Sequence, residues 1–241
     1  MKKELHGQAA LVTGGSRGIG FGIAQAFVKH GVNVAITGRD ESSLAEARRR
    51  LAAAGPGRVE THAVDVRDHS AIVRTVSATV AAFGGLDVVV NNAGIGTFAH
   101  IADMTPAQWA EVIDTNVTGV FNVCNAALPA LRQRGGGYIF NISSLAGKNP
   151  FIGAGAYCAS KAALNQFSEV LNQEIRHDNI KVTTIAPGSV ATAFAGGDEA
   201  HGADWKIATA DIGELVIDLL VLDTRSLPSY IELRPSKPPK K

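Results

Sequence analysis

The stretch Ala9-Ala10-Leu11-Val12-Thr13-Gly14-Gly15-Ser16-Arg17-Gly18-Ile19-Gly20 predicts a short apolar strand followed by a glycine-rich turn. A helical pattern continues from this turn to His30. A strand, a glycine turn and a helix in this order form the setting in which a dinucleotide's pyrophosphate binds, because glycine allows close approach of the backbone and the helix N-terminus favours negative charge. The spacing Gly-x-x-x-Gly-x-Gly differs from the common Gly-x-Gly-x-x-Gly, so a plain tight turn is the alternative interpretation.

Apolar strands and helical patterns alternate along the rest of the chain. This alternation is typical of a parallel sheet covered by helices on both faces, in one α/β domain that we expect to span residues 1–234. A basic, proline-rich tail, 235–241, follows that domain. Capping boxes at Ser43–Glu46 and Thr105–Gln108 predict two helix starts, and the second helix should run to about Leu131. Further strands are expected at 33–37, 59–65, 86–91, 138–142, 181–185 and 229–233, and further helices at 70–83, around Tyr157 and at 211–222.

Composition excludes several classes of function. The chain has 241 residues, of which 46% are hydrophobic and 19% charged, and its net charge of +1 gives no reason to expect a nucleic acid as partner. No apolar run is long enough to span a membrane, and the N-terminus lacks the apolar core of a secretory signal. Cys124 and Cys158 fit free thiols in a reducing compartment, so we expect a cytoplasmic protein. No metal site is expected.

Tyr157 and Lys161 lie four residues apart, and therefore on one face of a predicted helix. A Lys ammonium beside a phenol lowers the phenol's pKa, so the phenol can exchange a proton with a carbonyl or alcohol oxygen. Ser144 follows the predicted strand 138–142 and would face the same pocket at the carboxyl edge of the sheet. An ordinary amphipathic helix with an exposed Lys is the alternative for this pair alone.

Six motifs in their order along the chain resemble the short-chain dehydrogenase/reductase family. The resemblance covers about residues 9–192 and implies a Rossmann-type, doubly wound domain with a mostly parallel, seven-stranded sheet and a nicotinamide cofactor. The motifs are Thr13 to Gly20, Asn91-Asn92-Ala93-Gly94, Asn116, Ser144, Tyr157-Cys158-Ala159-Ser160-Lys161 and Pro187-Gly188-Ser189-Val190-Ala191-Thr192.

The same resemblance implies roles for four catalytic residues. Tyr157 would be the acid/base, and Lys161 would lower the pKa of Tyr157 and hydrogen-bond the nicotinamide ribose. Ser144 would donate to the substrate oxygen where negative charge develops. Asn116 would hold a water that links Lys161 to bulk solvent. The alternatives are a helix-surface amide for Asn116 and a turn residue for Ser144.

The residues expected to bind the cofactor follow several of the predicted strands or lie on the helix of Tyr157. By resemblance, the glycines of the first turn would cradle the pyrophosphate, Asp65 and Val66 would contact adenine, and Thr192 would bond the carboxamide. The full set is Gly14, Ser16, Arg17, Gly18, Ile19, Gly20, Arg39, Asp65, Val66, Asn92, Ala93, Gly94, Tyr157, Lys161, Pro187, Gly188, Val190 and Thr192.

The residues after the second strand favour NADP(H) over NAD(H). NAD enzymes carry an acidic residue there that bonds the ribose 2′-hydroxyl, whereas this chain has Gly38 followed by Arg39. Arg17 can approach the same position, and two guanidiniums can grip a 2′-phosphate. In the alternatives, Arg39 pairs with Asp40 or Glu41, or Asp40 reaches the ribose and permits NAD.

The expected function is an NADP-dependent oxidoreductase acting on a small-molecule carbonyl or secondary alcohol. The alternatives are a 3-oxoacyl thioester reductase, a non-catalytic nucleotide-sensing protein or an enzyme of another class such as an epimerase. The end of the chain lacks the glycine-rich terminus of many 3-oxoacyl reductases, which speaks against fatty-acid synthesis. The segment 193–208 is shorter than the family's usual lid and has few apolar anchors, so we expect it to be mobile. The resemblance implies a homotetramer or homodimer that pairs through the helices at Asn116 and Tyr157 and through the last strand.

Overall fold

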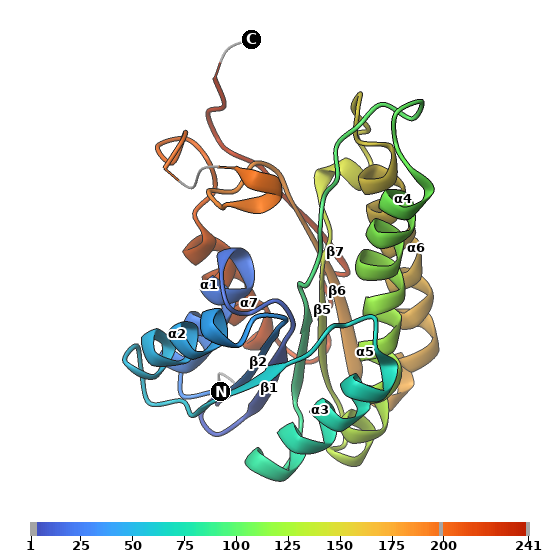
Figure 1. Ribbon diagram of the computed structural model, residues 1–241. Coiled ribbons are helices and arrows are strands. Elements are labelled where there is room, and N and C mark those ends of the chain that lie inside the picture. Colours follow the sequence, from blue (N-terminus) through green and yellow to red (C-terminus); the bar gives the residue numbers. More distant parts are fainter. Residues whose placement is uncertain (1–3, 198–199, 240–241) are drawn as a thin grey trace.

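A seven-stranded parallel sheet forms the centre of the protein (Figure 1), as predicted. The computed structural model describes residues 4–197 and 200–239, so parts of the N-terminus, of the predicted mobile segment and of the predicted tail lie outside the described residues. The strand order is β3-β2-β1-β4-β5-β6-β7. The strands are β1 (Ala9–Val12), β2 (Asn33–Gly38), β3 (Val59–Ala63), β4 (Val88–Asn91), β5 (Gly137–Ile142), β6 (Ile180–Pro187) and β7 (Tyr230–Leu233).

Helices cover both faces of this sheet, which confirms the doubly wound arrangement. One layer contains α1 (Gly18–Lys29), α2 (Glu41–Ala52) and α7 (Thr209–Leu220). The opposite layer contains α3 (His69–Phe83), α5 (Gly119–Gln133) and α6 (Gly155–Ile175), and the short α4 (Pro106–Ile113) precedes α5 (Figure 1). Among the described residues, no helix is long and apolar enough to cross a bilayer.

The five inner strands β1, β2, β4, β5 and β6 are largely buried on both faces, which explains their mostly apolar sequences, whereas the edge strands β3 and β7 are partly exposed. Val88 and Val90 point into the core under α1 and α7, whereas Val89, between them, points into the core under α3 and α5. Full burial of one such side chain stabilises the fold by about 1.5–3 kcal/mol relative to leaving it exposed. Because both faces need apolar residues, the period of two that marks a half-exposed strand is absent here.

The start of α2 differs from the prediction. Ser43 was expected to open the helix as a capping box with Glu46, but the N-cap is Asp40. Its carboxylate accepts hydrogen bonds from Ser43 N and Ser42 Oγ, each at 2.7 Å. Asp40 lies at the end of the extended segment, where its side chain can reach the free N–H groups, so the helix begins earlier. The capping box of Thr105 and Gln108 at α4 is confirmed.

The long helix predicted from Thr105 to about Leu131 contains an irregular turn. A π-helical segment, Asp114–Thr118, separates α4 from α5, and Gly119 N donates to Asp114 O across it. Such a turn contains an extra residue and often occurs at functional sites. Asn116 lies in its middle and is fully buried.

The strand order places a binding crevice at the carboxyl edge. β1 pairs with β2 on one side and with β4 on the other, so the chain leaves β1 and β4 towards opposite faces of the sheet. Ligands of doubly wound proteins bind at this switch point, beside the carboxyl ends of the strands. The glycine turn after β1 and the segment after β4 both lie there.

Candidate active site

Tyr157, Ser144 and Lys161 meet near the start of α6. Ser144 follows β5 in an extended conformation, and its side chain lies near enough to that of Tyr157 to lower the pKa of the phenol. Ser144 Oγ also accepts from Ala146 N at 3.1 Å, which fixes the hydroxyl. Lys161 is one helical turn beyond Tyr157 and is buried, with 6% of its surface exposed. The structure therefore brings together the three residues that the sequence placed in one pocket.

The pKa of Tyr157 is raised in this structure. Burial is the largest influence and raises the pKa of the phenol, while the Ser144 side chain lowers it. Lys161 Nζ lies 5.8 Å from the centre of the Tyr157 ring and donates to Ile142 O at 2.9 Å. Burial also lowers the pKa of Lys161 to about 8. Burial therefore sets the direction of the Tyr157 shift in this structure, and the lowering of the Tyr157 pKa by Lys161 stays a prediction.

Asn116 is held from two sides. Its Nδ2 donates to Ile95 O at 2.9 Å and to Ser160 Oγ at 3.0 Å, and its Oδ1 accepts from Ile95 N at 2.8 Å. Both amide hydrogens are used, so the side chain has only Oδ1 left to hold a water. The water-binding role stays a prediction. Ser160, which also donates to Tyr157 O at 2.8 Å, is a positioning residue that the sequence reasoning missed although it lies inside the Tyr157–Lys161 motif.

The glycine turn after β1 fits a dinucleotide's pyrophosphate. Gly14 and Gly18 have φ angles of 62° and 57°, which residues with a side chain rarely adopt. Arg17 is the N-cap of α1 but makes no side-chain cap, and the first turn has no acidic residue. The first N–H groups of α1 are therefore open to an anion. The Cβ that a residue other than glycine would have at position 20 would overlap Asn92 Nδ2 and Gly14 O, so Gly20 keeps the helix start close to β4.

The segment after β4 ties the glycine turn to the sheet. Thr13 Oγ1 accepts from the N–H groups of Asn92 and Ala93, both at 3.0 Å. Asn92 Nδ2 donates to the carbonyl oxygens of Thr13 and Gly14. A Cβ at Gly94 would lie 3.2 Å from Asn116 Oδ1. Asn92, Ala93 and Gly94 therefore connect the expected cofactor crevice with the catalytic residues.

The opposite wall of the crevice comes from the segment after β6. A Cβ at Gly18 would lie 3.4 Å from Thr192 Cγ2, so Thr192 faces the glycine turn. Pro187 ends β6, and Gly188 N donates to Leu233 O at 2.8 Å. Ile19 and Val190, which are partly buried apolar residues of the expected set, pack against the core under α1 and α7.

At the far end of the crevice, two arginines have free guanidiniums. Within the described residues, neither Arg17 nor Arg39 forms a hydrogen bond or an ion pair through its side chain, and both are exposed. A Cβ at Gly38 would lie 3.6 Å from Ser16 Oγ, so the Ser16 hydroxyl also faces this position. Asp40 is bound to α2 as its N-cap, and these hydrogen bonds lower its pKa to about 2. Among the described residues, Arg39 forms no ion pair with Asp40 or Glu41, and an approach of Asp40 to the ribose stays an alternative.

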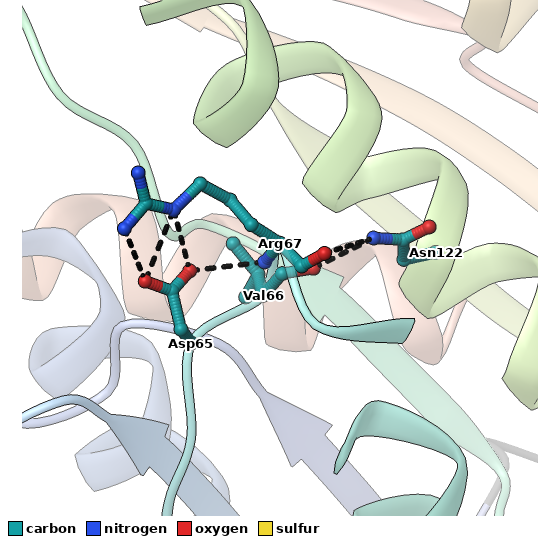
Figure 2. A network of polar contacts seen from close by, with 4 residues as sticks. All are labelled: Asp65, Val66, Arg67 and Asn122. Atoms are coloured by element: carbon teal, nitrogen blue, oxygen red, sulfur yellow. Dashed lines mark hydrogen bonds and ion pairs between the residues drawn. The ribbon is translucent and has the colours of Figure 1, made fainter. Parts of the chain in front are cut away.

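Asp65 and Val66 lie beside Arg67, a residue absent from the prediction (Figure 2). Asp65 and Arg67 form a two-pronged ion pair with distances of 2.6–3.0 Å, which lowers the pKa of Asp65, and Arg39 lies near enough to lower it further. Asn122 Nδ2 on α5 donates to the carbonyl oxygens of Val66 and Arg67 at 3.0 and 3.2 Å. The ion pair and the Asn122 hydrogen bonds together hold the main chain of residues 65–67 in place.

Two phenylalanines contact the Tyr157 ring and a third contacts one of these two, and the sequence reasoning missed all three. The centres of the Phe98 and Phe194 rings lie 5.8 and 5.6 Å from that of Tyr157, and Phe151 lies 6.0 Å from Phe98. The segment 193–208 is also tied down by a bridge between Val190 and the buried Ile207. The expectation of few apolar anchors there needs correction, and the mobility of this segment stays a prediction.

The geometry of the crevice and the comparisons with known proteins indicate the same protein family. A family model described as short chain dehydrogenase matches residues 8–201. The chain belongs to the short-chain dehydrogenase family. The predictions that it is such an enzyme, with the fold of this family, are confirmed.

Relatives in this family span most of the chain. An uncharacterized oxidoreductase of Staphylococcus saprophyticus is 36% identical over 232 residues, which is 96% of this chain and 99% of that protein. A 3-oxoacyl-[acyl-carrier-protein] reductase of Chlamydia muridarum is 40% identical over 197 residues, 82% of this chain and 79% of that protein. A crystal structure of a metagenomic short-chain oxidoreductase in complex with NADP is 37% identical, with a TM-score of 0.85 and coverage of 98% of this chain and 100% of that chain.

Proposed function

We propose that this short-chain dehydrogenase interconverts a carbonyl compound and a secondary alcohol with NADP(H), and that Tyr157 is the acid/base. The observation that carries the proposal is the Tyr157 side chain, which lies beside Ser144 and one helical turn before the buried Lys161. The nicotinamide, when bound, supplies the hydride for the carbonyl carbon. In reduction, the Tyr157 O–H bond breaks and its proton goes to the carbonyl oxygen, which leaves an alcohol and a tyrosinate.

The other catalytic residues assist the transfer of the Tyr157 proton to the substrate. Ser144 donates to the substrate oxygen and stabilises the negative charge that develops there. Because burial raises the pKa of Tyr157, the phenol keeps its proton at neutral pH, which favours its role as acid in reduction. Lys161 binds the ribose and returns a proton to Tyr157, and Asn116, held against Ser160, completes the route to solvent.

The choice of NADP(H) rests on the free cations at the far end of the crevice. The side chains of Arg17 and Arg39 form no hydrogen bond or ion pair among the described residues, and Gly38 leaves room where NAD enzymes place a carboxylate. A related structure contains NADP. With the Ser16 hydroxyl facing the same position, these groups supply the donors that a ribose 2′-phosphate needs.

Replacing Tyr157 by phenylalanine tests the reaction. We expect NADPH consumption with a panel of ketones, aldehydes and quinones to fall by roughly 10²–10⁴-fold, because the ring still packs while the proton donor is lost. NADPH binding should be unchanged. Tyr138→Phe is the matched control, since that hydroxyl hydrogen-bonds Thr183 near the other end of β5. If Tyr157→Phe retains most of the wild-type rate, Tyr157 is not the acid; if the wild type binds NADPH but reduces nothing in the panel, the protein is a nucleotide sensor.

A second candidate is the reduction of a 3-oxoacyl thioester, which the relative from Chlamydia muridarum favours. The chemistry and the catalytic residues would be the same, and only the substrate would differ. Acetoacetyl thioesters of coenzyme A and of acyl carrier protein belong in the panel for this reason. If kcat/KM for these thioesters is far above that for every ketone, the function is the reduction of a 3-oxoacyl thioester.

We also propose that the protein is a homodimer or homotetramer. Exposed apolar side chains lie on the helices expected to pair: Trp109 on α4, Phe121 on α5 and Val170 on α6, which are 42%, 50% and 53% exposed. At the edge of the sheet, β7 pairs with β6 alone among the described residues, and its other side can be covered by another chain. Light scattering should show an oligomer at micromolar concentration, and Phe121→Glu should dissociate it. A monomeric wild type would refute this.

A further inference from the structure

The surroundings of Tyr157 are unusually aromatic for a chain with few aromatic residues. Phe98 meets the Tyr157 ring edge to face at 5.8 Å and an interplanar angle of 78°. Phe194 approaches the same ring at 5.6 Å, and Phe151 extends the group beyond Phe98. Only 6% of the chain is Phe, Trp or Tyr, yet four of these rings contact one another beside the hydroxyl that we assign to the reaction.

These rings are held in place but remain open to solvent. Phe98, Phe151 and Phe194 are 48%, 54% and 41% exposed. Ala99 N donates to Gly153 O at 2.8 Å, which joins the segment after β4 to the loop before α6. Exposed aromatic side chains that gather at one place mark a binding surface rather than a core.

Two further apolar side chains continue the same surface. Ile101 and Ile152 are 68% and 86% exposed. Ile101 packs so closely on Gly155 that a Cβ at that position would overlap it. Half of the ten large hydrophobic side chains that are exposed in the described part of the chain therefore lie in this one surface.

The surface carries almost no charge. His100 is the one titratable side chain in the three segments that form it, 95–101, 150–154 and 193–196, all of which the structure describes. In the described part of the chain, no cation lies over the ring of Phe98, Phe151 or Phe194. Lys148, which is near in sequence, is bound to Glu232 at 3.3 Å and lies over the Tyr230 ring.

We propose that the substrates of this enzyme are uncharged ketones with an aromatic ring or a bulky alkyl group, and that Phe98, Phe151 and Phe194 bind this group. The inference rests on the proposed reaction at Tyr157. A ketone whose oxygen meets the hydroxyls of Tyr157 and Ser144 places its substituents among these rings. Offset and edge-to-face stacking stabilises an aromatic substituent there, and a carboxylate would be desolvated without a cation to pair with.

A matched pair of ketones tests whether the enzyme prefers an uncharged substrate. 4-Methylacetophenone and 4-acetylbenzoate differ by a methyl group in place of a carboxylate. We expect kcat/KM with NADPH to favour the neutral ketone on the order of 100-fold, because the carboxylate loses water and gains no partner. Equal values, or a preference for the acid or for acetoacetyl thioesters, overturn the inference.

Two single substitutions test whether the phenylalanine rings bind the substituent of the ketone. Phe98→Ala and Phe194→Ala should each lower kcat/KM for 4-methylacetophenone about tenfold and that for butanone less than about threefold, because butanone has no group for the rings to bind. Phe83→Ala is the control, since Phe83 lies at the end of α3 with the Arg58 guanidinium 5.2 Å from its ring centre. If the two substitutions affect both ketones equally, the rings do not bind the substituent.

Calorimetry separates this inference from the proposed reaction. The Tyr157→Phe variant loaded with NADPH should bind 4-methylacetophenone without consuming it, and should bind 4-acetylbenzoate far more weakly. Turnover of butanone with no preference for the neutral aryl ketone overturns the aromatic site alone. Binding of the neutral ketone by an enzyme that reduces no carbonyl overturns the proposed reaction and supports the aromatic site.

Discussion

Replacing Arg39 by alanine should weaken the use of NADPH and leave the use of NADH unchanged. Arg39 is exposed at the end of β2, where Gly38 has no side chain to block a phosphate and Ser16 Oγ faces the same position. The guanidinium forms no hydrogen bond or ion pair within the described residues, so its removal leaves no buried group without a partner. The change therefore reports on the cofactor and not on the stability of the fold.

The size of the effect follows from one charge-assisted contact. A hydrogen bond to a charged group contributes about 1.5–3 kcal/mol, and exposure to solvent places Arg39 near the lower end. At about 1.4 kcal/mol for each factor of ten, kcat/KM for NADPH should fall about 10- to 30-fold. If Arg17 binds the same phosphate, the double variant should lose more than either single variant, and the two losses should not simply add because the two arginines share a partner.

Steady-state kinetics with NADPH and with NADH, at a fixed substrate concentration, measures the cofactor preference of each variant. Arg49→Ala is the matched control, because Arg49 is an exposed arginine that pairs with Glu46 on the surface of α2. Added salt should reduce the NADPH preference of the wild type but not that of the double variant. A wild type that prefers NADH, or an Arg39→Ala variant with an unchanged NADPH preference, would refute the reasoning.

Three further results are expected. Asp40→Ala should lower the free energy of unfolding in urea titrations and Ser43→Ala should lower it much less, because Asp40 is the N-cap; a larger loss with Ser43→Ala would contradict this assignment. Lys161→Met should raise the free energy of unfolding of the cofactor-free protein by roughly 1–3 kcal/mol at pH 7. The cost of burying the charged amine is fully present below pH 8 and disappears as pH rises from about 8 to 10.5, so the gain should shrink over that range; a constant gain would contradict the assigned cause. Asn122→Ala should raise KM for NADPH and NADH alike, because Asn122 holds the main chain at Val66; an effect on one cofactor only would contradict this.

The fold was largely predictable because the decisive patterns are local. The glycine turn after β1 and the apolar run 138–142 each carry their signal within a few residues. The start of α2 was misplaced because Asp40 and Ser43 are both good N-cap residues, and sequence alone does not show which of them has the extended backbone. The π-helical turn was missed because nothing in the sequence Asp114–Thr118 distinguishes it from a regular helix.

The candidate site was predictable where its residues share one element and hidden where they do not. Tyr157 and Lys161 face one side because they lie four residues apart. The direction of the Tyr157 pKa depends on burial by distant segments, which spacing does not report. Phe98, Phe151 and Phe194 come from three loops far apart in the sequence, and each is an isolated aromatic residue with no periodic pattern. Only the folded chain brings them together.

The π-helical turn also fixes how long the segment from α4 to α5 must be. Each residue of an α-helix turns the chain by about 100°, so deleting one residue between Asp114 and Thr118 would rotate α5 by that angle relative to α4. Val112 on α4 and Val123 on α5 are both buried, and no single rotation keeps both in the core. Relatives should therefore carry no insertion or deletion between positions 112 and 123, whatever substrate they use. The number of residues in this segment, and not only the identity of residue 116, fixes where the Asn116 side chain lies.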